Sequence, residues 1–174
     1  DVDGFTLGTD QTIFNESGGT PKHVSWNWKA GAGNTAFSES GNNPAGTHNA
    51  NVEAGFSIVS YVGTGAAGTV AHGLGAAPEW IFIKNRDVND AWAVYYGDNT
   101  DYLVFDEDAT ADAATYFNDT SPSATVFTVN TAHSVNADGE NYIAYCWREI
   151  DGYSKIGSYI GNSNVFGQFA YTGF

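Results

Sequence analysis

The sequence predicts an all-β protein, folded as an antiparallel β-sandwich or jelly roll and built from repeated units. Short apolar runs alternate with polar residues and end at Gly, Asn, Asp or Ser, and no stretch has the spacing of an amphipathic helix. Gly contributes 21 of the 174 residues, well above its usual share of about 7%. About a dozen short strands separated by such turns are typical of a sandwich or jelly roll.

Two segments of the chain each occur twice, and the repeated units do not begin and end where the chain does. His23–Lys29 is echoed by Tyr142–Arg148, and Gly55–Gly63 is echoed by Gly152–Gly161. Repetition of large units is more typical of fibres and adhesins than of compact enzymes. The echoes divide the chain into 1–29, the end of a preceding β repeat; 30–54, an insertion or linker rich in Gly, Asn and Ser with little to bury; 55–151, one complete β-sandwich unit; and 152–174, either the start of a following repeat or closing strands.

Alternation of apolar and polar residues places the individual strands. In the segment 23–29, Val24, Trp26 and Trp28 share one face, as they would in an extended strand. The acidic stretch 106–114 fits either a surface loop or one helical turn. The expected strands are 5–7, 12–14, 23–29, 56–62, 69–72, 80–84, 91–96, 102–105, 116–117, 126–130, 142–149, 153–160 and 168–171.

The chain is strongly acidic, which excludes some partners. Six Lys and Arg stand against 20 Asp and Glu, giving a net charge of −14. Such a field repels phosphate backbones and anionic lipid, so we expect no nucleic-acid partner. Because there is no run of about 18 apolar residues, we also expect no membrane insertion. The single Cys146 cannot form an internal disulfide and is expected to be a small buried hydrophobic residue.

A polar turn flanked by aromatic residues, within 92–102, is the candidate ligand-binding site. Aromatic faces stack on sugar rings, while Asp and Asn accept hydrogen bonds from hydroxyl groups. The alternative is that the same aromatic residues are half-buried rungs of the sandwich, since aromatic residues are common in strands. The candidate residues are Trp92, Tyr95, Tyr96, Asp98, Asp101 and Tyr102.

Acidic residues raise two further possibilities, catalysis and metal binding. Glu79 and Glu149 lie at strand ends, and glycoside hydrolysis needs two converging acids, but we expect these two to be ordinary solvated acids at strand ends. Oxygen ligands suited to calcium cluster at Asp1 and Asp3 and again at 106–108, but neither cluster matches the twelve-residue calcium loop. Bound calcium and ordinary acidic turns both stay open. The four His residues lack the spacing of a zinc site, and no catalytic residue is assigned.

Five segments, in this order, carry a resemblance to a known family. They are 55–61 (GFSIVSY), 72–86 (HGLGAAPEWIFIKNR), 92–95 (WAVY), 127–129 (FTV) and 141–147 (NYIAYCW). Together they resemble a repeat domain found in large structural proteins of marine tailed phages, often described as tail-fibre or virion proteins. The resemblance covers residues 55–174 and, as the end of a preceding copy, 1–29. It implies a concanavalin-like sandwich, as in lectins and glucanases, and it assigns no catalytic residue.

These observations lead us to expect a structural or adhesive protein of a bacteriophage virion, in a fibre or appendage at the virion surface. It would bind the host surface, with glycans as the ligand class, and assemble with other virion proteins as a homo-oligomer, a trimer in a fibre. A capsid decoration or head-fibre protein and a bacterial surface adhesin are structural alternatives. A secreted polysaccharide-degrading enzyme or its carbohydrate-binding module, an extracellular protein, is the alternative of a different class. We expect no enzymatic activity.

Overall fold

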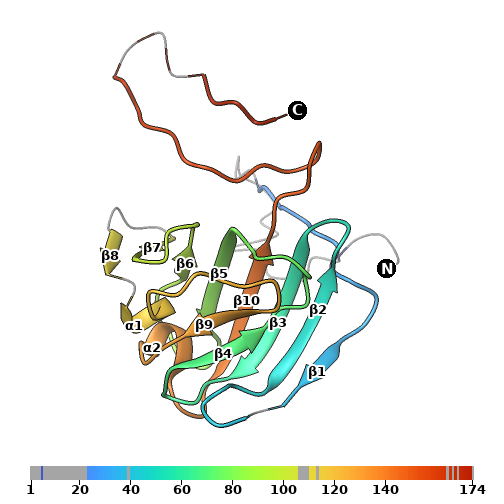
Figure 1. Ribbon diagram of the computed structural model, residues 1–174, viewed down its shortest axis with the longest axis vertical. Helices are drawn as coiled ribbons and strands as arrows, with labels where there is room; N and C mark the ends of the chain where they lie inside the picture. Colours follow the sequence, from blue (N-terminus) through green and yellow to red (C-terminus); the bar gives the residue numbers. More distant parts are fainter. Residues whose placement is uncertain are drawn as a thin grey trace, which may run out of the picture.

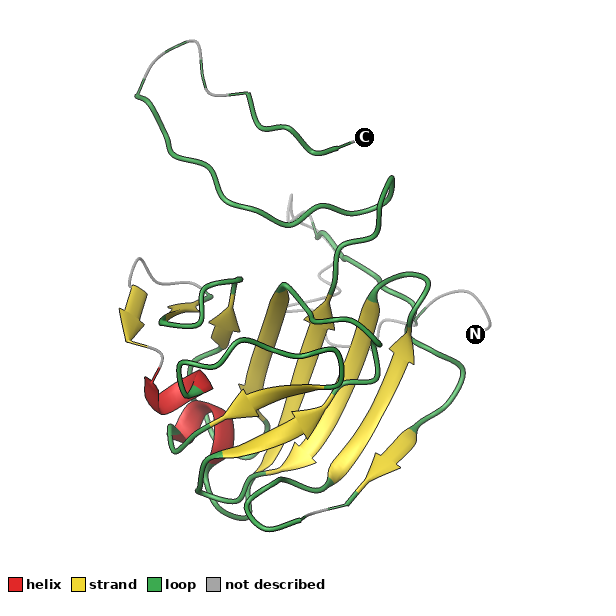
Figure 2. Cartoon of the chain, viewed as in Figure 1, coloured by secondary structure: helices red, strands yellow, loops and turns green. Residues whose placement is uncertain are grey.

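The computed structural model describes residues 5, 23–38, 40–105, 110–112, 114–163, 165, 167 and 169–173. Within them the chain is mostly β, with one antiparallel sheet of eight strands, a second sheet of two strands and two short helices (Figures 1 and 2). The strands are β1 (Thr35–Phe37), β2 (Gly46–Asn51), β3 (Phe56–Val62), β4 (Gly68–Ala71), β5 (Trp80–Asn85), β6 (Ala93–Tyr95), β7 (Asp101–Val104), β8 (Thr110–Asp112), β9 (Val126–Val129) and β10 (Asn141–Trp147), and the helices are α1 (Ala114–Phe117) and α2 (His133–Asn136).

The last strand in sequence lies at the centre of the large sheet, whose order is β1-β2-β3-β10-β5-β6-β7-β8. Tyr145 of β10 pairs with Ile58 of β3 on one side and with Phe82 of β5 on the other. Because successive side chains of a strand point to opposite faces, β10 buries Tyr142, Ala144 and Cys146 on one face and presents its remaining residues on the other. The register of β10 therefore decides the composition of both faces.

One face of the large sheet packs against the core. The two-stranded sheet of β4 and β9 and the two helices cover this face (Figure 1). Tyr61 and Ile81 from the large sheet pack with Phe127 of β9 and Phe117 of α1 in one cluster of buried side chains. The core residues are Val59, Tyr61, Val70, Leu74, Ile81, Ile83, Ala93, Tyr95, Phe117, Phe127, Val129, Val135, Tyr142, Ala144 and Cys146.

Most of the strands expected within 55–151 are confirmed. The predicted strands 56–62, 69–72, 80–84, 91–96, 102–105, 126–130 and 142–149 match β3, β4, β5, β6, β7, β9 and β10, with differences at the ends. Tyr116 and Phe117, predicted as a strand, lie instead in α1, and the short helix α2 was not expected. A single helical turn gives too short a pattern for sequence periodicity to distinguish it from a strand.

Residues 30–54, expected to be an insertion or linker with little to bury, contribute β1 and β2 to the large sheet. β2 pairs with β3 along its length, with His48 opposite Val59 and Ala50 opposite Ser57. The sequence of β2, GTHNAN, has no large apolar side chain. Its backbone hydrogen bonds to β3 hold it in place, so composition alone did not reveal the strand.

Two predicted strands are extended segments that, among the described residues, join no sheet, although Ser154 forms an isolated bridge with Ile150. These are 23–29, which crosses the outer face of the large sheet, and 153–160, which begins with a turn and leaves the domain (Figure 1). Alternation fixes which side chains share a face, but a strand also needs a neighbour that offers backbone N–H and C=O groups. The predicted strands 5–7 and 12–14, apart from Phe5, and Gln168 in 168–171 lie outside the described residues.

Candidate functional site

The face of the large sheet opposite the core is aromatic. Trp80 and Phe82 alternate along β5 with the buried Ile81 and Ile83, and Tyr145 and Trp147 alternate along β10 in the same way. The antiparallel register sets these rows side by side, with Trp147 opposite both Trp80 and Phe56. Side chains directly opposite on one face of a sheet are in contact, so the rows merge into one surface.

The aromatic rings of this surface contact one another continuously. The ring centroid of Trp147 lies 5.0 Å from that of Phe82, 5.1 Å from Phe56 and 5.5 Å from Trp28. The surface is hollowed into a cavity of about 870 Å³, which we call the aromatic groove. Its lining residues are Trp26, Asn27, Trp28, Phe56, Ile58, Trp80, Phe82, Trp92, Phe105, Tyr145, Trp147, Ser154, Lys155 and Ile156.

Two extended segments form walls of the aromatic groove. The first, 26–28, is held where Asn51 of β2 donates a hydrogen bond to the Lys29 carbonyl (3.3 Å). The second, 154–156, is held by the Glu149 carboxylate, which accepts hydrogen bonds from Lys155 Nζ (2.6 Å) and from the Ile156 N–H (3.1 Å). The ends of β2 and β10 therefore position the walls.

The aromatic groove is apolar, nearly uncharged and open to solvent. Trp26, Trp28 and Phe105 keep 76%, 52% and 61% of their surface exposed. Among the lining residues that the structure describes, only Lys155 carries a full charge, and it is paired with Glu149. The hydrogen bond from Lys155 lowers the pKa of Glu149, so this carboxylate is ionised at neutral pH. The groove can therefore offer stacking and apolar contact but few directional polar groups.

The structure does not bring the aromatic members of the predicted ligand-binding site together on one face of the sheet. Trp92 lines the aromatic groove, where its ring lies 6.3 Å from that of Tyr145 with planes inclined at 27°. Tyr95 is buried in the core against Phe117 (5.7 Å). Tyr102 stacks on Tyr116 at 3.6 Å and packs against the core. Tyr95 and Tyr102 therefore fit the alternative interpretation, in which they are structural rungs of the sheet.

The polar members of the predicted site shape the local backbone. Asp98 Oδ1 accepts hydrogen bonds from the Thr100 N–H (2.9 Å) and Thr100 Oγ1 (2.8 Å), and these bonds lower the pKa of Asp98. Asp101 is the first residue of β7, and Tyr96 is half-buried just after β6. The structure thus brings only Trp92 of the six residues into the groove. The aromatic alternation at 80–82 and 145–147 was the signal that could have located it.

Comparison with known proteins finds a match to one family model. A model for a domain of unknown function, DUF7483, matches residues 1–174. The chain belongs to the DUF7483 family. No curated protein and no solved structure matches it.

The other predicted chemical sites of the DUF7483 domain can be placed only in part. Glu79 Oε2 accepts a hydrogen bond from the Glu149 N–H (2.8 Å), so both predicted acids serve the turn that follows β10. The predicted calcium ligands Asp1, Asp3 and 106–108 lie outside the described residues. Across the described part of the chain, no three His, Cys, Asp or Glu side chains cluster as metal ligands would. The described helices include none long and apolar enough to cross a membrane.

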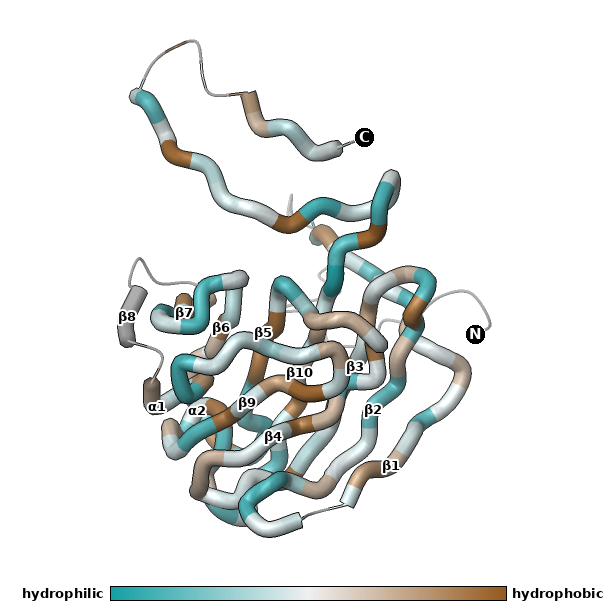
Figure 3. Tube along the Cα trace, viewed as in Figure 1, coloured by the Kyte–Doolittle hydropathy of each residue, from teal (hydrophilic) through white to brown (hydrophobic). Residues whose placement is uncertain are grey.

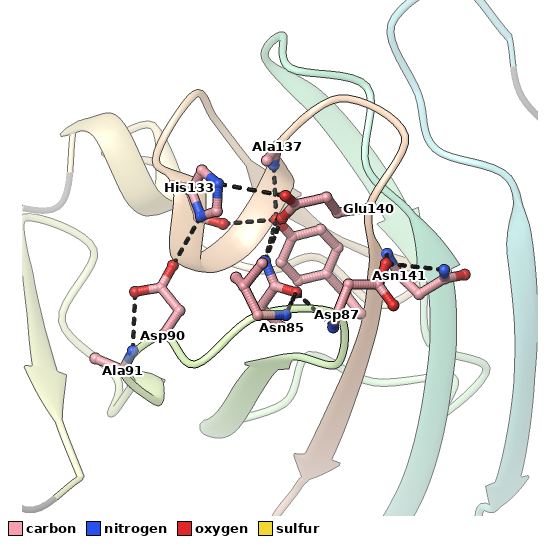
Figure 4. Close-up of polar contacts among 10 residues, drawn as sticks. Asn85, Asp87, Asp90, Ala91, His133, Ala137, Glu140 and Asn141 are labelled. Carbon is pink, nitrogen blue, oxygen red and sulfur yellow. Dashed lines mark hydrogen bonds and ion pairs between the residues drawn. The ribbon is translucent and has the colours of Figure 1, made fainter.

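A polar cluster lies at the other end of β5 and β10 in the DUF7483 domain (Figure 4). His133 of α2 sits between two carboxylates, with Nδ1 3.0 Å from Asp90 Oδ2 and Nε2 3.4 Å from Glu140 Oε1. Hydrogen bonding to Asp90 raises the pKa of His133. Asn85 of β5 donates to Glu140, and its Oδ1 accepts from the Asp87 N–H (2.9 Å). The cluster ties α2 to the loop after β5, which is a structural role.

Proposed function

We propose that the chain is a structural domain of a bacteriophage virion, in a fibre or appendage, and that it associates with protein through the aromatic groove. The groove carries this proposal, because Lys155 is the one charged residue among the fourteen described residues that line it. The cores of protein interfaces are enriched in Trp, Tyr and Phe and depleted in charge. Exposed apolar patches on otherwise polar proteins mark interaction sites.

The virion setting rests on the resemblance of residues 55–174 to repeat domains of marine tailed-phage structural proteins. A large antiparallel sheet covered on one face by a two-stranded sheet supports a concanavalin-like sandwich with a reduced second layer. The repeated segments of the sequence support an architecture of repeated units. If the chain is part of a fibre, the homo-oligomer that we propose is a trimer. Imaging a virion that carries a labelled copy of the chain would distinguish a tail fibre from a capsid decoration or head fibre.

Because a homo-oligomer is the expected assembly, self-association of the purified chain tests the proposal directly. Trp80 lies on the outer face, 4.7 Å from Phe82 between ring centroids, so Trp80→Ser alters the groove without touching the core. Val62→Ser is the matched control, an exposed residue on the same face outside the groove. We expect Trp80→Ser to weaken association about tenfold or more, as for the loss of an interface anchor. Sedimentation across a concentration series measures it, and equal association of both variants would contradict the proposal.

Adhesion to host-surface glycans is the second candidate function. The observation that favours it is the near-parallel pair of Trp92 and Tyr145, with the polar side chains of Asn27, Ser154 and Lys155 also lining the groove. An exposed ring can stack on a sugar while such groups bond its hydroxyls. We expect Trp92→Ala to reduce binding to host cells or to a glycan array, while Val62→Ser keeps it. Absence of binding by the unmodified chain would remove adhesion.

We propose no catalytic role for Glu79 and Glu149. Each carboxylate accepts a backbone hydrogen bond, and Glu149 is paired with Lys155. Glycoside hydrolysis needs one acid that is protonated in the resting state. The lowered pKa of Glu149 works against such a role for that residue. Release of reducing sugars from bacterial polysaccharides, abolished by Glu149→Gln, would instead establish the enzyme alternative.

A further inference from the structure

After the groove wall at 154–156, the described chain runs apart from the two sheets as an extended segment (Figures 1 and 2). We call residues 156–173 the C-terminal segment. Apolar residues are spread along it (Figure 3). Those with 76–93% of their surface exposed are Tyr159, Ile160, Val165, Phe169 and Tyr171. Leaving this much apolar surface in water is unfavourable, so the segment has the properties of a chain that lies against another surface.

The composition of the C-terminal segment matches that of the aromatic groove. No Asp, Glu, Lys, Arg or His occurs after Lys155, in a chain that carries 20 acidic and six basic residues. Copies with a net charge of −14 repel one another over most of their surface. A contact between this uncharged segment and the nearly uncharged groove avoids that repulsion. It also buries apolar groups on both sides.

The start of the C-terminal segment has the sequence of a strand but no strand partner among the described residues of its own copy. The segment 152–161 echoes 55–63, which contains β3, and Phe56 and Ile58 of β3 line the aromatic groove. Within 155–160 the described backbone is extended but belongs to no sheet. A segment that suits an extended conformation and has apolar side chains can dock along a groove or add to a sheet as a further strand.

We propose that the C-terminal segment of one copy lies in the aromatic groove of a second copy. The proposal rests on the association function proposed above and names its partner. Lys155 and Ile156 are already part of the groove wall, so each segment starts beside one groove and can reach another. A chain of eighteen residues, when fully extended, spans about 60 Å, which is enough to cross to a neighbouring domain. The groove of each copy is then closed by another copy, and chains link through exchanged segments.

A complementation experiment with the full chain tests the exchange. The groove variant is Trp80→Glu, and the segment variant combines Ile160→Glu, Phe169→Glu and Tyr171→Glu. The matched control adds the same charge to the same segment at exposed positions, as Ser158→Glu, Ser163→Glu and Ala170→Glu. All substitutions lie outside the buried core, and circular dichroism together with the unfolding midpoint verifies that each variant is folded.

We expect the groove variant and the segment variant, each alone, to associate at least about tenfold more weakly than the unmodified chain, as for the loss of interface anchors. We expect the control to associate more strongly than the segment variant. Mixing the two variants restores association, because the groove variant supplies an intact segment and the segment variant an intact groove. Analytical ultracentrifugation with one variant fluorescently labelled detects the mixed species.

Three outcomes would overturn the inference, and they separate it from the proposed function. If the segment variant associates like the unmodified chain while the groove variant does not, the groove is an interface but its occupant is different. If the two variants fail to complement each other, exchange of segments is wrong. If the unmodified chain remains monomeric at high concentration and binds host glycans in a Trp80-dependent way, both self-association and the exchange are wrong, and adhesion is supported.

Discussion

Tyr61 and Tyr142 stack in the core, with ring centroids 5.2 Å apart and planes inclined at 15°, and both direct their hydroxyl groups to the region of α2. Tyr61 Oη donates to the Val135 carbonyl (2.6 Å). Tyr142 Oη donates to the His133 carbonyl (2.5 Å) and accepts from the Ala137 N–H (2.8 Å). Burial raises the pKa of both phenols, that of Tyr142 to about 12, so both are neutral at ordinary pH.

Removing the Tyr142 hydroxyl should cost more stability than removing that of Tyr61. Tyr142→Phe leaves a backbone donor at Ala137 and an acceptor at His133 without their partner, and we expect a loss of about 2–3 kcal/mol. Tyr61→Phe removes one hydrogen bond, to Val135, with an expected loss of about 1 kcal/mol. Urea unfolding of both variants measures the difference, and equal losses would contradict this role of Tyr142.

The polar cluster around His133 should make stability depend on pH. Its pKa is raised above the usual 6.5, first by the hydrogen bond to Asp90 and also by the charge of Glu140. The protonated form therefore stabilises the fold fully below the unfolded value, and this contribution is lost as pH rises through the higher folded value. His133→Gln should flatten the stability profile between about pH 5 and 8.

Thermal unfolding across this pH range measures the effect of His133→Gln. His23→Gln provides the control, since His23 lies exposed on the extended segment outside the polar cluster. An unchanged profile in His133→Gln would mean that the ion pairs with Asp90 and Glu140 contribute nothing to stability.

Gly73 and Gly75 should respond differently to the same substitution. Both have a positive φ, of 73° and 71°, which strains any residue with a side chain. A Cβ on Gly73 would overlap the His48 ring, whereas a Cβ on Gly75 meets nothing within 4 Å. We expect Gly75→Ala to cost about 1 kcal/mol and Gly73→Ala about 3 kcal/mol or more. Chemical denaturation tests this, and equal costs would rule out the contact with His48.

Cys146 should be inert in the folded chain. It is buried near the C-terminal end of β10, between Ser57 of β3 and Ile81 of β5, and burial raises the pKa of its thiol. Because the thiolate is the reactive form, Ellman's reagent should label the thiol only after denaturation. Labelling of the native chain at a rate near that of the denatured chain would place Cys146 at the surface.

The sequence by itself determined most strands within 55–151 and the side chains that share a face. Val59 and Tyr61 could be assigned to one face of β3 from alternation alone, because the two-residue period is a local property of the strand. The burial of Cys146 followed in the same way from its aromatic, alternating surroundings. The candidate site was only partly predictable, since of its six residues Trp92 alone reaches the groove.

The tertiary structure decided which segments pair and what covers each face. The sequence of β2, GTHNAN, is typical of a linker. It nevertheless forms a strand, because the backbone N–H and C=O groups of β3 pair with it along its length. The segment 155–160, which reads as a strand, has no such neighbour in the described chain. Trp80 and Trp147 meet only because β10 returns to lie beside β5. The aromatic groove forms only when strands distant in sequence pair in one register. No single stretch of sequence therefore predicts it.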